Sequence, residues 1–183
     1  MEIDRKKRVA LMLPIIIFLL LVSVSYALDL PAYVKVLQAI KPPVITIHSP
    51  EPKNYSMEKL WLKVTVNQPV DNWWYKLNSG TNKSFTPNIT IDVARCGNNL
   101  TVYANSSGNV GFSSVKFNAL RGDVDGDKDV DIFDIIKCAS AFGSKKGNPR
   151  FKPVCDIVPS PDGDGVINIF DITAITGNYG RKC

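Results

Sequence analysis

The sequence predicts a multidomain protein of mixed β plus α class, in which a β-sandwich is followed by a small α-helical domain and preceded by an apolar helix. Three observations support this fold class: an apolar run from Val9 to Val24, a series of short β-rich runs over residues 44–120, and an internal repeat near the C-terminus. The expected boundaries are 1–27 for the apolar segment, 28–42 for a linker, 43–120 for the β-sandwich and 121–183 for the repeat domain.

The N-terminal segment indicates export from the cell. The basic block Arg5-Lys6-Lys7-Arg8 precedes the apolar run, and Ser25-Tyr26-Ala27 places small residues where a signal peptidase cuts. An uncleaved signal anchor is the alternative, because the 19 residues Val9–Ala27 are long enough to cross a membrane as a helix. In both cases we expect the chain after Ala27 to lie outside the cell, either secreted or membrane-anchored.

Residues 44–120 contain six short runs rich in β-branched and aromatic residues, separated by turn residues. The runs are Val44–Ile47, Leu60–Val66, Trp73–Leu77, Asn88–Val93, Leu100–Ala104 and Val110–Phe117. Six such runs within about 75 residues predict a β-sandwich. Because successive side chains of a strand point to opposite faces, we expect one of Trp73 and Trp74 to point into the core and the other outward.

This segment resembles the immunoglobulin-like modules of microbial, especially archaeal, surface proteins. The resemblance rests on Ile47-His48-Ser49-Pro50, Trp74–Asn78, Leu100–Asn105 and Gly108–Gly111. It implies an immunoglobulin-like β-sandwich. Cys96 is the only cysteine of the segment, so the bridge between the sheets of antibody domains is absent.

Five Asn-X-Ser/Thr sequons lie between residues 54 and 107, and none lies elsewhere in the chain. They predict glycosylation of a surface domain. The alternative is that a β-domain rich in Ser, Thr and Asn contains such triplets by composition alone. The asparagines concerned are Asn54, Asn82, Asn88, Asn99 and Asn105.

The C-terminal domain repeats itself at a spacing of 37 residues, since Ile132-Phe133-Asp134-Ile135 recurs as Ile169-Phe170-Asp171-Ile172. Six aspartates in twelve residues precede and include the first Asp of this motif. Such a cluster repels itself unless a hard cation with oxygen ligands binds there, and the spacing matches an EF-hand calcium loop. The predicted ligands are the side chains of Asp123, Asp125, Asp127, Asp131 and Asp134 and the backbone carbonyl of Asp129. Lys128 occupies the turn position that normally holds glycine.

The second loop is less regular. Counting back from Asp171 gives Asn168, the carbonyl of Val166, Asp164 and Asp162 as ligands, with Gly165 at the turn. The first ligand position then falls on Ser160, a weak neutral donor. An insertion over residues 157–161 would instead let Asp156 supply the first carboxylate, and both readings stay open.

The two loops, each followed by one helix and joined by Gly147-Asn148-Pro149, resemble a dockerin over residues 122–180. The resemblance implies two Ca²⁺ sites and a cohesin-type protein domain as partner. In dockerins the residues before the last calcium ligand contact the cohesin, which implies partner contacts by Ile132, Phe133, Ile169 and Phe170. The alternative is that both phenylalanines pack between the helices.

Composition excludes several other classes of function. The net charge of +5 is spread along the chain without a basic stripe, which argues against nucleic-acid binding. The four acids of residues 43–120 are isolated from one another, which argues against a glycoside hydrolase and against any enzyme. We therefore expect a non-catalytic extracellular or cell-surface adaptor in a polysaccharide-degrading or surface assembly. The alternatives are a structural, calcium-stabilised surface glycoprotein or an accessory component of a glycoside hydrolase system.

Overall fold

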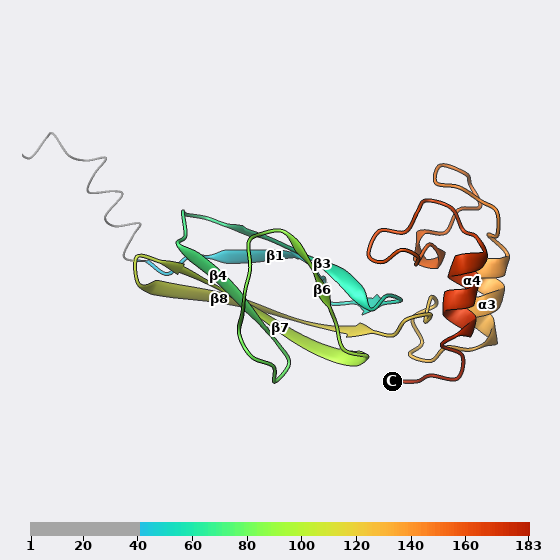
Figure 1. Ribbon diagram of the computed structural model, residues 1–183, viewed down its shortest axis with the longest axis horizontal. Helices are drawn as coiled ribbons and strands as arrows, with labels where there is room; N and C mark the ends of the chain where they lie inside the picture. The colour runs from blue at the N-terminus through green and yellow to red at the C-terminus, as the bar shows by residue number, and fades with distance from the viewer. Residues whose placement is uncertain (1–40) are drawn as a thin grey trace, which may run out of the picture. The chain divides into compact units, whose positions relative to one another are not determined.

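The computed structural model describes residues 41–183, and most of this part of the chain folds as a β-sandwich (Figure 1). The predicted signal or anchor segment 1–27 and nearly all of the linker 28–42 lie outside the described residues. Among the residues that are described, no helix is both long enough and apolar enough to span a membrane.

Eight strands form the two sheets of the sandwich. The first sheet is antiparallel with the order β1-β3-β6, and the second has the order β2-β8-β7-β4-β5. Only β2 runs parallel to its neighbour, β8. The strands are β1 Ile45–Ser49, β2 Asn54–Tyr55, β3 Lys59–Val66, β4 Asn72–Leu77, β5 Lys83–Ser84, β6 Ile89–Asp92, β7 Cys96–Ser106 and β8 Asn109–Ala119.

The core of the sandwich consists of the inward side chains of both sheets, including Leu62, Leu100 and Val102, which are completely buried. Trp73 packs against this core, whereas Trp74 points away from it and stacks on Tyr103. The predicted opposition of the two tryptophans is therefore confirmed, and it follows from the alternation of side chains along β4.

The sandwich contains two strands more than the sequence predicts. β2 and β5 are two residues long and lie at the two edges of the five-stranded sheet. Two residues are too few to show an alternating pattern, so the sequence carries no signal for them.

Residues 120–183 have a second, smaller apolar core. Two short helices, α3 Ile132–Ala139 and α4 Ile169–Thr176, lie side by side, and the 3₁₀ turn η1 spans Pro153–Cys155 (Figure 1). Val130, Ile157, Ile167 and Ile175 are almost completely buried there. A disulfide joins Cys138 to Cys155 inside this core, with 5.3 Å between the Cα atoms.

The second disulfide joins Cys96 at the start of β7 to Cys183 at the C-terminal end of the chain. Backbone hydrogen bonds also connect the two regions, since the N–H groups of Leu120 and Gly122 donate to the carbonyls of Tyr55 and Ser56. Residues 42–183 accordingly form one compact unit.

Candidate metal centre

The carboxylate of Asp134 organises the first loop. Asp134 is the third residue of α3 and is completely buried, and its Oδ2 accepts a hydrogen bond from the N–H of Asp131 at 2.8 Å. Asp131 caps the helix in return by accepting from the N–H of Phe133. This reciprocal capping box satisfies backbone donors that the first turn of a helix leaves unpaired. Oδ1 of Asp134 accepts from the N–H groups of Val124 and Asp125, so the loop folds over the carboxylate.

Asp123 fixes the turn at the other end of the loop. Its Oδ1 accepts from the N–H of Gly126 at 2.7 Å and its Oδ2 from the N–H of Lys128 at 3.0 Å. Lys128 has a φ of 78°, the left-handed conformation that its place in the predicted loop requires. A residue with a Cβ pays roughly 1–2 kcal/mol for this conformation, and the hydrogen bond to Asp123 helps to hold it there.

Three of the predicted ligands converge. Asp123, Asp125 and Asp134 each place a carboxylate oxygen within 4.8 Å of the others, and Asp127, Asp129 and Asp131 form a second such group. Carboxylate oxygens are the donors that calcium prefers, and the predicted ligands of this loop are therefore chemically suited to it.

The electrostatics of the loop favour a bound cation. Burial raises the pKa of Asp123 above its ordinary value, and repulsion from Asp134 and Asp127 adds to this effect, while hydrogen bonds from Gly126 and Lys128 oppose it. Burial likewise raises the pKa of Asp125, with repulsion from Asp134 as a further cause. A divalent cation among these oxygens would offset both the burial and the repulsion.

The second loop has a similar hydrogen-bond pattern with Asp156 in the place of Asp123, although one donor is Asp164 and not Gly163, the repeat counterpart of Gly126. Oδ1 and Oδ2 of Asp156 accept from the N–H groups of Asp164 and Gly165, and Gly165 has a φ of 81°. The completely buried Asp171 accepts from the N–H groups of Ile157, Val158 and Asn168, as Asp134 does from the matching residues of the first loop. The structure thus makes Asp156 the geometric counterpart of Asp123.

The remaining predicted ligands of the second loop have different hydrogen-bond partners. Ser160 donates its hydroxyl to the carbonyl of Ile157, so it does not occupy the position equivalent to Asp123. Asp164 accepts from the N–H of Val166 and from the side-chain amide of Asn168, which also caps α4. Asp162 points to the sandwich, where both of its oxygens accept from the indole N–H of Trp61 at 2.8 and 2.9 Å.

The apolar residues at the start of both helices face solvent. Ile132 and Phe133 are 47% and 64% exposed, and Ile169 and Phe170 are 57% and 68% exposed. The alternative that both phenylalanines pack between the helices is therefore wrong. The exposed apolar set also includes Ile136, Phe142 and Tyr179. Phe142 and Tyr179 occupy equivalent positions of the repeat, each directly before a glycine, and this recurring pair is their signal in the sequence.

The predicted glycosylation sites lie in different surroundings. Asn82, Asn88 and Asn99 are exposed, and Asn105 is partly exposed. The amide nitrogen of Asn54 donates to the carbonyl of Gly126 in the first loop at 2.7 Å, and its oxygen accepts from Asn118. The side-chain oxygen of Asn88 accepts from the N–H of Val64.

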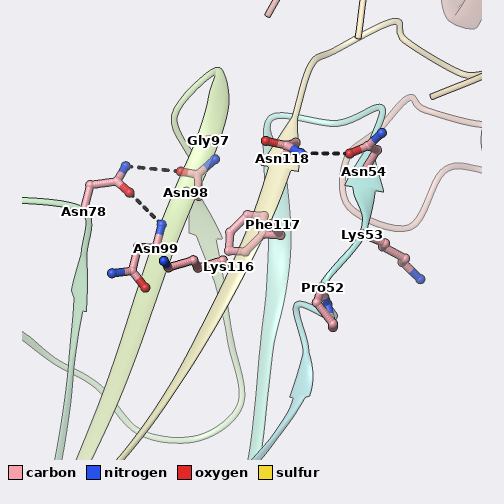
Figure 2. A pocket seen from close by; sticks show the side chains of 10 residues that line it. All are labelled: Pro52, Lys53, Asn54, Asn78, Gly97, Asn98, Asn99, Lys116, Phe117 and Asn118. Carbon is pink, nitrogen blue, oxygen red and sulfur yellow. Dashed lines mark hydrogen bonds between the residues drawn. The ribbon is translucent and has the colours of Figure 1, made fainter. Parts of the chain in front are cut away.

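A cavity of about 450 Å³ lies on the sandwich and is lined by none of the predicted metal ligands (Figure 2). Five asparagines contribute to its lining, and two of them, Asn78 and Asn98, are hydrogen-bonded to each other. No Asp or Glu side chain is among the residues that line this cavity. The cavity therefore lacks the pair of carboxylates that glycoside hydrolysis requires.

No protein-family model matches the chain, and a search of curated proteins found no match. Among solved structures it is similar to the fibronectin(III)-like modules of CbhA from Clostridium thermocellum, with 13% identity and a TM-score of 0.37, over 45% of this chain and 48% of that one. It is also similar to an endo-β-1,4-mannanase from Thermotoga petrophila, with 9% identity and a TM-score of 0.38, over 45% of this chain and 20% of that one. A third similarity is to a type II cohesin-X-dockerin complex from Acetivibrio cellulolyticus, with 18% identity and a TM-score of 0.31, over 60% of this chain and 81% of that one. The chain thus spans less than half the length of the first two proteins, and none of the three likenesses is close enough to assign a function.

Proposed function

We propose that this protein is a non-catalytic adaptor outside the cell, whose C-terminal domain binds two calcium ions and docks to a cohesin-type domain. The observation that carries the proposal is the pair of equivalent loop-and-helix units. In each unit a completely buried aspartate of the helix accepts hydrogen bonds from equivalent backbone N–H groups of the loop, and an exposed Ile-Phe pair begins the same helix.

In the first loop Asp123, Asp125 and Asp134 would hold the ion, joined by Asp127, Asp131 and the carbonyl of Asp129. In the second loop Asp156, Asp164 and Asp171 would hold it, with Asn168, the carbonyl of Val166 and a released Asp162. A bound calcium ion supplies the positive charge that the clustered carboxylates of each loop lack. With the ions bound, the two loops would hold α3 and α4 in a fixed orientation.

The docking face follows from the exposure of the two Ile-Phe pairs. Exposed apolar side chains that lie together often mark an interaction surface, whereas single exposed ones are common on any protein. The pairs occupy equivalent positions of the two units, so a partner could bind either pair. Burying one aromatic side chain in an interface contributes about 1.5–3 kcal/mol.

Binding of the full-length exported protein to a panel of cohesin domains, with excess calcium, tests the proposal. Replacing Ile132 and Phe133 by alanine should weaken binding only slightly, because the second pair remains. Replacing all four residues of the two pairs should abolish binding while calcium affinity stays within severalfold of the original. Binding by none of the panel, or undiminished binding by the fourfold variant, would contradict the docking role.

A structural role is the second candidate, and contacts between the loops and the sandwich favour it. Asn54 holds the first loop through Gly126, and Trp61 holds the second through Asp162. In this case calcium would stabilise a surface glycoprotein without recruiting a partner. The same panel separates the candidates, because the structural role predicts calcium-dependent folding without cohesin binding.

A further inference from the structure

Three aromatic side chains form a row across the outer face of the five-stranded sheet. Trp74 of β4 is the register partner of Tyr103 of β7, and Tyr103 is the register partner of Phe112 of β8. The rings of Trp74 and Tyr103 are stacked with centroids 5.5 Å apart, and those of Tyr103 and Phe112 lie 6.2 Å apart. Phe112 is 69% exposed, the largest exposed fraction among the large apolar side chains of the described residues.

A predicted glycosylation site lies beside this row on the same face. Asn105 follows Tyr103 by two residues on β7, and its register partner Val110 precedes Phe112 by two residues on β8. Side chains two residues apart on a strand share a face and are separated by roughly 6–7 Å. Asn105 also lies next to the hairpin turn formed by Ser107 and Gly108, and its side chain is partly exposed, with Oδ1 buried and without a hydrogen-bond partner.

Asn105 differs in this respect from the other four sequon asparagines. The residue two positions before it is Tyr103, whereas the corresponding residues of the others are Pro52, Gly80, Thr86 and Gly97. Of the five sequon asparagines, Asn105 is therefore the one with an aromatic side chain two residues before it, on the same face of the strand.

We propose that Asn105 carries an N-linked glycan whose first sugars pack on Tyr103 and Phe112 and thereby stabilise the sandwich. In the transfer step, Nδ2 of Asn105 loses a proton and bonds to the anomeric carbon of a polyprenyl-phosphate-linked oligosaccharide. The bond from that carbon to the phosphate oxygen breaks, and the phosphate leaves with the electron pair and the released proton. No atom changes its oxidation state.

The physical basis is the amphipathic character of sugar rings. One face of a pyranose presents mainly C–H groups, which pack on aromatic rings as other apolar groups do. Covering Phe112 in this way removes apolar area from water that the folded chain otherwise exposes. Because the sugar is attached to the same strand, it reaches the ring at a high effective concentration.

The test compares the same chains from two sources in excess calcium: a host that N-glycosylates exported proteins, and the oxidising periplasm of a bacterium that does not. Ser107→Ala removes the Asn105 sequon. The change in Tm that this substitution causes in the unglycosylated protein is its effect on stability apart from the glycan. In the glycosylated series Ser107→Ala should lower the Tm by about 2–4 °C more than in the other series. In a Phe112→Ser background most of this difference should disappear.

Thr90→Ala is the matched control, because it removes the sequon of Asn88, which directly precedes β6 and has Thr86 in place of the aromatic residue two positions before it. Its effect on the Tm should be the same in both series. Mass spectrometry showing Asn105 unmodified in the glycosylating host would overturn the proposal. An equal effect of Ser107→Ala in both series, or a difference that persists in the Phe112→Ser background, would overturn it as well.

Discussion

Asp134 and Asp171 are completely buried, and each accepts hydrogen bonds from three backbone N–H groups. Such a residue serves two purposes, because one carboxylate shapes the loop and also offers the ligand that would close it around a cation. Removing it leaves one buried and two partly buried N–H donors without this partner, and the buried donor alone costs about 1–3 kcal/mol. Substitution of either residue should therefore affect folding and calcium binding together.

Asp156 allows a cleaner test of the second calcium site. Asp156→Asn should reduce the number of calcium ions bound per chain from two to one, because it removes the charge of the residue equivalent to Asp123. Ser160→Ala should leave both sites intact, since the Ser160 hydroxyl is bonded to the carbonyl of Ile157. Isothermal titration of calcium into the metal-free chain measures both numbers. Loss of the second site in Ser160→Ala but not in Asp156→Asn would contradict the assignment.

The two loops differ in how far their residues could be predicted. In the first loop the twelve-residue spacing leads directly to Asp123, Asp125 and Asp134 as a group, and the structure brings their oxygens together. In the second loop residues 157–161 break the spacing, so counting along the chain leaves Ser160 and Asp156 as rival candidates. The hydrogen bonds from Asp164 and Gly165 to Asp156 are contacts in space that no sequence count contains.

The two helices are short elements that depend on their loops. α3 and α4 have eight residues each, which is below the length at which an isolated helix is stable in water. Each begins with a capping box whose two acceptors belong to the neighbouring acidic loop. Repulsion among the carboxylates of the first loop therefore acts directly on the start of α3.

Removing calcium should consequently unfold most of the helical structure while the sandwich remains folded. The helical signal of the full-length protein in circular dichroism should decrease on addition of a chelator and return with excess calcium, because binding energy contributes directly to folding. The near-ultraviolet signal of Trp73 and Trp74, recorded in parallel in a Trp61→Phe chain because Trp61 contacts Asp162 of the second loop, should change little. A helical signal that the chelator leaves unchanged would show that the disulfide of Cys138 and Cys155 and the small core suffice.

At the level of elements, the sequence predicted the six longer strands but not the full length of each, and it did not predict the two short ones. β7 spans Cys96–Ser106, whereas the predicted run covers only Leu100–Ala104. The β7–β8 turn consists of Ser107 and Gly108, both at positive φ, rather than of the neighbouring pair Gly108 and Asn109, whose residue types also favour a turn. Glycine and asparagine both tolerate positive φ, so composition alone does not determine which of the neighbouring pairs forms the turn.

At the level of the whole molecule, the C-terminal residues connect the sandwich to the first loop. The segment 180–183 lies beside residues 128–130, with the N–H of Val130 donating to Arg181 and the N–H of Cys183 donating to Lys128. Lys182 forms an ion pair with Asp129 at 2.7 Å, and this contact raises the pKa of Lys182. The disulfide to Cys96 fastens this segment to the start of β7. Because the sandwich has one cysteine and the C-terminal domain has three, full pairing requires one bridge between them, but the sequence does not determine which C-terminal cysteine forms it.

Opening this bridge should therefore weaken calcium binding at the first loop and spare the second. In a chain with Cys96→Ser and Cys183→Ser, the C-terminal segment loses its covalent attachment, so the turn at Lys128 and Asp129 is held only by the remaining hydrogen bonds. We expect calcium affinity at the first site to fall by about two- to tenfold, which corresponds to at most about 1.4 kcal/mol.

The second loop serves as the internal control, because its partners Asp156 and Asp171 make no contact with residues 180–183 among the hydrogen bonds described above. Two-site calcium titrations of the variant and of the original chain measure both affinities, and the same two chains carrying Asp156→Asn identify which affinity belongs to the first site. Equal loss at both sites would instead indicate that the bridge stabilises the C-terminal domain as a whole, and no loss at either would show that the segment 180–183 keeps its place without it.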